Sequence, residues 1–213
     1  MIKSEAELAF VRRAGELADD ALDAGLAVIG ADADEGDILA AMQGAVLAGC
    51  GDYPGNPFII GSGEDAQLCR TKSGRRKLGA SDQITLEFAG VFRMYLVALM
   101  RTVLVGEPGA LHQHMHNAAA EALAACEAVM RPGHTFGDLY AAHAPTFDRL
   151  GMGRHRLNAC GYSLGTRYAP SWMDAPMFYD GNPERIVPGM VLFAHMILMD
   201  SDSGNAMTLG RTY

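Results

Sequence analysis

The sequence has 213 residues, of which 49% are hydrophobic and 20% are charged, and this composition excludes a chain that is disordered as a whole. Its length suits one domain with a substantial core. The net charge of −8 argues against nucleic acid or an anionic membrane as the main partner. No stretch resembles a membrane span or a signal peptide. The four cysteines form no CxxC pair, so we expect reduced thiols in a cytoplasmic protein.

The first half of the chain changes from a helical to a strand-like pattern. Ser4 and Glu7 form a capping-box pattern, and apolar residues recur at steps of three and four as far as Leu26. A second helix is expected to begin at Asp34. Short segments rich in β-forming residues follow and predict antiparallel strands, at residues 57–61, 66–71, 83–89, 92–97 and 99–105.

The second half repeats the order of helices and then strands. A long helix is expected after Pro108, through residues 118–129, and Thr135 with Asp138 predicts the cap of another. Strands are expected at residues 157–162, 190–198 and 206–213. This order predicts an α+β fold, in which helices cover an antiparallel sheet.

Two polar residues interrupt apolar strands. His195 lies within residues 191–198, where it is either a hydrogen-bonded core histidine or a functional group. Glu87 lies within residues 84–89, and a buried carboxylate is rare unless it is paired, protonated or functional. An ion pair with Arg101 on a neighbouring strand is the structural alternative for Glu87.

Other chemical motifs are less specific. His112, His114 and His116 lie near a helix start, which favours a solvated helix end over a metal site. Residues 161–165 match the string GxSxG, but no helix pattern follows, which argues against a serine hydrolase. Glycines around Tyr162 and Ser163 allow close approach of a ligand. The aromatic residues that follow fit either a hydrophobic lid or a cation-binding wall: Tyr168, Trp172, Phe178 and Tyr179.

Nearly the whole chain resembles the creatinase and aminopeptidase P superfamily. The resemblance is carried by residues 100–102 (MRT), 105–108 (VGEP), 131–133 (RPG), 161–165 and 188–191 (PGMV). It implies the pita-bread fold, a curved antiparallel sheet covered by helices. The metallopeptidases of this superfamily bind two metal ions through two Asp, one His and two Glu. Those positions fall on Glu87, Ala98, Tyr162, His195 and, approximately, Gly210.

None of these positions keeps the ligand of the metallopeptidases. Ala98 and Gly210 offer no side-chain donor, and tyrosine is a poor ligand for Mn, Co or Zn. We therefore expect no dinuclear metal site and no cofactor.

The segments around these positions resemble the ectoine hydrolase branch of the superfamily, at residues 86–90, 158–165, 170–174 and 195–204. This resemblance implies metal-independent opening of the cyclic amidine of ectoine to N-acetyl-2,4-diaminobutyrate. Glu87 would attack the amidine carbon or act as base for water. His195 would pass a proton to the departing nitrogen, and Tyr162 would hydrogen-bond the intermediate. We expect the ectoine-like zwitterion to contact Trp172, Tyr168, Phe178, Asp202 and Tyr95.

Two other functions remain open. One is a metal-dependent peptidase or a creatinase-like C–N hydrolase. The other is a non-catalytic homologue that binds a small solute or a partner subunit; Leu96, where relatives tend to have histidine, favours it. The resemblance also implies a homodimer. We expect residues 1–213 to form one catalytic-type domain that lacks the superfamily's N-terminal domain and last C-terminal strand.

Overall fold

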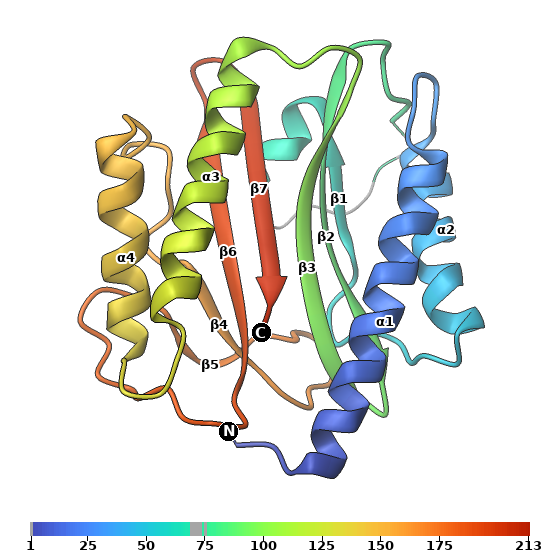
Figure 1. The fold of residues 1–213 in the computed structure, drawn as a ribbon. Helices are drawn as coiled ribbons and strands as arrows, with labels where there is room; N and C mark the ends of the chain where they lie inside the picture. The colour runs from blue at the N-terminus through green and yellow to red at the C-terminus, as the bar shows by residue number, and fades with distance from the viewer. Residues whose placement is uncertain (1, 69–73, 75) are drawn as a thin grey trace.

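The structure is a computed structural model that describes residues 2–68, 74 and 76–213. Four α-helices, a short 3-10 helix and seven strands follow one another within these residues (Figure 1). In chain order they are α1 (Glu5–Val28), α2 (Glu35–Ala48), β1 (Ile59–Ser62), η1 (Gly63–Gln67), β2 (Asp82–Phe92), β3 (Tyr95–Val105), α3 (Ala110–Val129), α4 (Phe136–Arg149), β4 (Gly161–Leu164), β5 (Asp174–Met177), β6 (Val191–Asp200) and β7 (Asn205–Thr212).

The predicted helix caps are confirmed. Ser4 and Glu7 make the reciprocal capping box at the start of α1, and Thr135 and Asp138 make the same box at α4. The Asp34 carboxylate accepts a hydrogen bond from the Gly36 amide and caps α2. Each cap satisfies backbone N–H groups that a helix start leaves without partners, which explains why the sequence located these starts.

The described strands form one antiparallel sheet in the order β1-β2-β3-β7-β6-β4-β5. The expected break between residues 92–97 and 99–105 is wrong. β2 and β3 are continuous, and their hairpin turns at Arg93 and Met94, which both have positive φ. Such turns usually carry Asn-Gly, so Arg-Met gave no turn signal.

Two further strand predictions need correction, and one strand was missed. Residues 66 and 67 belong to η1 rather than to a strand, and residues 69–71 lie outside the described residues. The strand expected at 157–162 is β4, which begins only at Gly161. β5 was not predicted, because its sequence Asp-Ala-Pro-Met lacks β-forming residues.

The three cysteines among the described residues are free thiols; Cys126 and Cys160 are buried, and Cys50 is exposed. No helix in the described part of the chain is long and apolar enough to cross a membrane.

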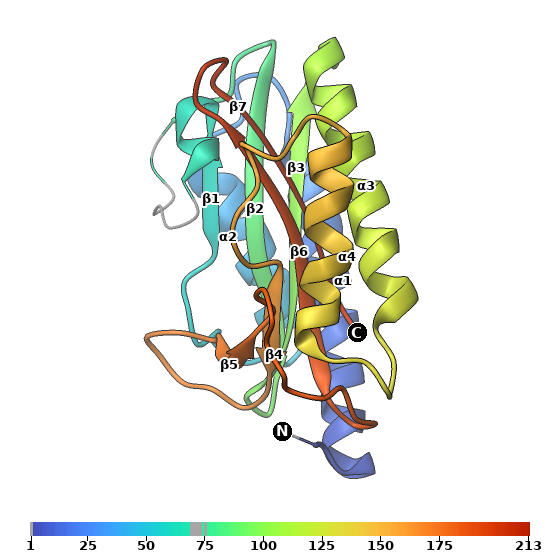
Figure 2. The ribbon, with the colours of Figure 1, turned by 90° about the vertical axis from the view of Figure 1, so that its left-hand side faces the viewer.

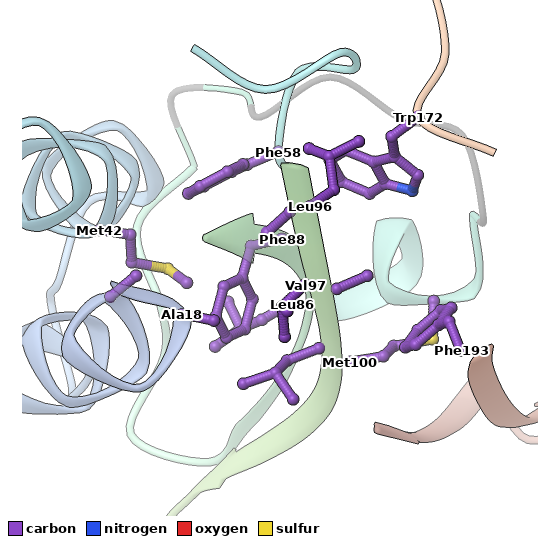
Figure 3. Close-up of a cluster of buried hydrophobic side chains, with 14 of the residues drawn as sticks. Ala18, Met42, Phe58, Leu86, Phe88, Leu96, Val97, Met100, Trp172 and Phe193 are labelled. Carbon is purple, nitrogen blue, oxygen red and sulfur yellow. The ribbon is translucent and has the colours of Figure 1, made fainter. Parts of the chain in front are cut away.

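Helix α1 lies directly on β2. A Cβ built on Gly90 would come within 1.9 Å of the Ala14 carbonyl oxygen, so the helix and strand backbones meet there. Phe88, two residues earlier on the same face of β2, points toward Ala18 and Met42 of the helix pair (Figure 3). Figure 2 shows α3 and α4 on one side of the sheet and η1 on the other. The face of β2 opposite α1 carries Glu87, because strand side chains alternate.

Candidate active site

The strand register brings five separated positions to one face of the sheet. Glu87 is opposite Met100 in the β2–β3 pair, and Ala98 is two residues from Met100. Gly210 is opposite both Met100 and His195. Tyr162 is opposite Phe193, which lies two residues before His195. Because residues directly opposite each other, or two apart, share a face, Glu87, Ala98, Tyr162, His195 and Gly210 all point away from α1.

A cavity of about 180 Å³ lies on this face. Four residues predicted to act in the site line it: Glu87, Tyr162, Trp172 and His195. Its remaining described lining is mostly apolar: Asn56, Ile59, Met100, Leu157, Ala159, Ser171, Met173, Met177 and Ile197. The structure thus brings together side chains from β2, β4, β6 and the segment before β5.

Glu87, Tyr162 and Trp172 form a chain of hydrogen bonds. The indole Nε1 of Trp172 donates to the Tyr162 hydroxyl at 2.9 Å, and this hydroxyl donates to Oε1 of Glu87 at 3.4 Å. All three side chains are buried. The second bond is long for O–H···O, which is common at catalytic contacts before substrate binds.

His195 faces the same cavity as a neutral imidazole. Burial lowers its pKa to about 4, so the ring carries no charge at pH 7. Its Nδ1 is buried without a hydrogen-bond partner among the described residues. The ring lies between aromatic neighbours, with centroids 5.7 Å from Tyr162 and 5.6 Å from Phe193. These rings fix the position of the imidazole.

The described residues do not fit the two-metal site of the superfamily. Among them, no group of three or more His, Cys, Asp or Glu side chains is placed to hold a metal ion. A Cβ on Gly210 would come within 2.8 Å of both Met100 Cβ and Phe193 Cζ. The space into which a ligand side chain at position 210 would extend is therefore already filled. Ala98, also on this face, supplies only a methyl group.

Four other predicted substrate contacts do not line this cavity. Phe178 is fully buried in a second core cluster, edge-on to Phe136. Tyr168 is 69% exposed and lines a different hollow. Asp202 forms an exposed ion pair with Arg154, and the Tyr95 hydroxyl donates to Glu7 near the start of α1. The expectation that these residues gather around Glu87 is thus corrected.

The positions of Arg101, Ser163 and the clustered histidines decide between the alternatives that the sequence left open for them. Arg101 lies on the face opposite to Glu87, and its guanidinium donates to the carbonyls of Met100 and Gly210. Ser163 lies within β4, where its hydroxyl donates to the Ala175 carbonyl, and it is not on a nucleophile elbow. Two of the three clustered histidines bond to neighbouring chain segments, His112 to the Gln83 side chain and His114 to the Leu150 carbonyl.

Several lining residues were missed by sequence reasoning. Asn56 is buried in the turn before β1, and its amide nitrogen donates to the Pro57 carbonyl. Met100, Met173 and Met177 place three thioethers at the cavity. A methionine in an apolar stretch is usually interpreted as a core residue, so the sequence alone does not single out these three methionines.

Solved structures with a similar fold include a prolidase and an aminopeptidase. The prolidase of Pyrococcus furiosus superimposes with a TM-score of 0.92 at 19% identity. The match covers 99% of this chain and 61% of the prolidase chain. The X-Pro aminopeptidase of Thermotoga maritima gives a TM-score of 0.91 at 19% identity. That match covers 100% of this chain and 58% of the aminopeptidase chain. These likenesses establish the pita-bread α+β fold. The profile of metallopeptidase family M24 matches residues 9–209, and the chain belongs to this family of hydrolases.

Curated relatives are distant and longer. An uncharacterised hydrolase/peptidase of Sinorhizobium fredii is 27% identical over 201 residues, which is 93% of this chain and 50% of the relative. The ectoine hydrolase of Halomonas elongata is 28% identical over 141 residues, 66% of this chain and 35% of the relative. The Xaa-Pro dipeptidase of Pyrococcus furiosus is 21% identical over 196 residues, which is 90% of this chain and 56% of the relative. The chain thus spans about half the length or less of the first two relatives.

Proposed function

We propose that this chain carries the site of a hydrolase that opens a cyclic amidine of the ectoine type, without a metal ion. The observation that carries the proposal is the Glu87 carboxylate, which lines a cavity together with Tyr162, Trp172 and His195. Support from relatives is the partial similarity to the ectoine hydrolase of Halomonas elongata.

The charge of the cavity suits a cationic ring. Among its described lining residues, Glu87 alone has an acidic side chain, and burial keeps His195 neutral. The aromatic side chains of Trp172 and Tyr162 also line the cavity, and aromatic rings attract cations. An amidinium would therefore meet one carboxylate and two π systems, with no opposing positive side chain among these residues.

The size of the cavity suits a single six-membered ring. An apolar cavity of roughly 150 Å³ accommodates benzene in another protein, and the cavity beside Glu87 measures about 180 Å³. A zwitterion built on one such ring is therefore a closer match than an extended peptide.

The reaction needs one water molecule and two proton transfers. Glu87 accepts a proton from water as the water oxygen bonds to the amidine carbon, and the Tyr162 hydroxyl hydrogen-bonds the tetrahedral intermediate. The bond from this carbon to one ring nitrogen then breaks. The proton that Glu87 took from water passes through His195 to the departing nitrogen, which leaves as an amine, while the carbon becomes an amide carbonyl and both residues return to their starting states. Alternatively, the Glu87 carboxylate attacks the same carbon and expels one ring nitrogen as an amine, and hydrolysis of the resulting O-imidoyl ester gives the same products.

Incubation with ectoine tests the proposal. We expect the ring-opened product by chromatography, and loss of turnover by at least a hundredfold in Glu87→Gln with the fold retained. Glu184→Gln is the matched control, because Glu184 is exposed and does not line the cavity. Turnover by Glu87→Gln within a few-fold of the parent would refute the role of the carboxylate. Absence of product from the unaltered chain would refute the substrate.

A metal-dependent peptidase is the second candidate, favoured by the match to family M24 and to the Xaa-Pro dipeptidase. The two candidates differ in substrate and in metal requirement. Cleavage of an Xaa-Pro dipeptide only after addition of Mn²⁺ or Co²⁺, with no reaction on ectoine, would reverse our order.

A further inference from the structure

Trp172 is held at the cavity by a polar contact as well as by packing. Its side chain is almost fully buried, yet its indole N–H reaches the Tyr162 hydroxyl at 2.9 Å. An indole nitrogen can only donate, so the Tyr162 oxygen must be the acceptor. A tyrosine hydroxyl has a single hydrogen, and the bond from Trp172 leaves that hydrogen directed toward Glu87.

We infer that Trp172 is a positioning residue, whose indole N–H orients the Tyr162 hydroxyl so that it donates to Glu87. This inference rests on the proposed function for its kinetic test alone. It differs from a stacking role, because it assigns the effect of Trp172 to its nitrogen rather than to its ring.

Two physical effects support this role. Donation into the Tyr162 oxygen polarises the hydroxyl and strengthens its own donation, since linked hydrogen bonds reinforce each other. The contact also restricts rotation about the Tyr162 C–O bond. The Tyr162 ring is already fixed by its edge contact with Phe193, at a centroid distance of 5.3 Å. The indole N–H, as a donor to the hydroxyl oxygen, then acts on the direction of the hydroxyl hydrogen.

A double-mutant cycle measures the coupling. Trp172→Phe removes the N–H and keeps an aromatic face, and Tyr162→Phe removes the hydroxyl and keeps the ring. With ectoine as substrate, each change should lower kcat by roughly three- to tenfold and leave KM nearly unchanged. The double variant should be no slower than Tyr162→Phe, because Trp172 acts through the hydroxyl.

The spectroscopic test needs no substrate. Trp172 is the only tryptophan in the sequence, so the tryptophan fluorescence of the protein comes from this residue alone. Tyr162→Phe removes the acceptor of the indole N–H and should shift the emission maximum. Tyr179→Phe is the matched control, because Tyr179 is half-exposed and does not line the cavity; it should leave both emission and kcat unchanged.

The outcomes separate the two proposals. An emission shift in Tyr162→Phe, together with non-additive losses of kcat, supports the positioning role. Unchanged emission in Tyr162→Phe, or equal losses from Trp172→Phe in both backgrounds, overturns it. If the unaltered chain does not turn over ectoine, the proposed function fails, and the emission of the folded Tyr162→Phe variant still decides the role of Trp172. Circular dichroism of each variant identifies any that fails to fold.

Discussion

Met100 fills the space that a side chain at Gly210 would occupy. The two residues are directly opposite each other where β3 meets β7, and a Cβ on Gly210 would lie 2.8 Å from the Met100 Cβ. Phe193 closes the same space from β6 (Figure 3). Packing thus leaves no room for a donor side chain at this position, which the resemblance to the superfamily aligns approximately with a metal ligand.

Gly210→Ala should destabilise the fold by about 1–3 kcal/mol, because the added methyl must displace backbone-anchored atoms in a packed core. Urea unfolding followed by circular dichroism measures this loss. Gly15→Ala is the control, since nothing lies within 4 Å of a Cβ at that helical position. It should stabilise the chain by about 0.5–1 kcal/mol. Equal stability of Gly210→Ala and the parent would contradict the packing described for this position.

Metal should have little effect on the site. If Glu87 acts without a metal ion, protein purified without chelator should contain well below one equivalent of Mn, Co or Zn by elemental analysis. Incubation with EDTA followed by desalting should leave turnover of ectoine unchanged within about twofold. Two equivalents of tightly bound metal, or activity that returns only when metal is added back, would contradict this expectation.

His143 should make the fold sensitive to acid. Burial, followed by the neighbouring His195, lowers the pKa of His143 to about 3, and its Nδ1 has no partner among the described residues. The unfolded chain titrates near 6.5 and holds more protons between pH 6.5 and 3. The free energy of unfolding should therefore decrease as the pH is lowered through this window, by up to about 1.4 kcal/mol per pH unit for this group.

Thermal unfolding of His143→Leu checks this sign. The variant should lose less stability than the parent between pH 7.5 and 4.5, because leucine takes up no proton. Part of the pH dependence of stability should remain, because the pKa of His195 is also lowered, to about 4, and its protonation acts in the same direction. His116→Leu, at an exposed position of α3, should leave the parent's pH dependence unaltered. Parallel curves for His143→Leu and the parent would argue against the buried neutral imidazole.

Met94→Gly should stabilise the β2–β3 hairpin. Met94 has φ of 65°, a conformation that costs energy for a residue with a side chain and little for glycine. The bond from the Met94 amide to the Asp52 carboxylate uses the backbone and survives the change. We expect a gain of up to about 1 kcal/mol in the free energy of unfolding. A loss would show that the methionine side chain contributes more than the turn conformation costs.

Local signals predicted the helices well. Caps such as Ser4 with Glu7 and Thr135 with Asp138 are encoded within four residues, so the sequence alone located these helix starts. The β2–β3 turn was missed because its conformation is imposed by strand pairing on residues that do not favour it. β5 was missed for a similar reason.

The site was predicted only in part. Glu87 and His195 stood out as polar residues in apolar strands, but their meeting depends on the register of four strands, which no local pattern encodes. The resemblance to a known superfamily supplied that link. Nothing in the sequence indicates which aromatic side chains point into the cavity: Trp172 lines it, whereas Phe178 is buried elsewhere and Tyr168 is exposed.

The contact between Gly90 and α1 limits how this scaffold can be redesigned. A Cβ there would overlap the Ala14 carbonyl at 1.9 Å and approach the Ala18 amide nitrogen at 2.4 Å, both of which belong to the helix backbone. Backbone atoms cannot change rotamer to make room, so any larger residue must lift α1 from the strand that carries Glu87. Directed-evolution libraries that reshape the cavity should therefore hold position 90 constant and vary the methionines on the opposite face.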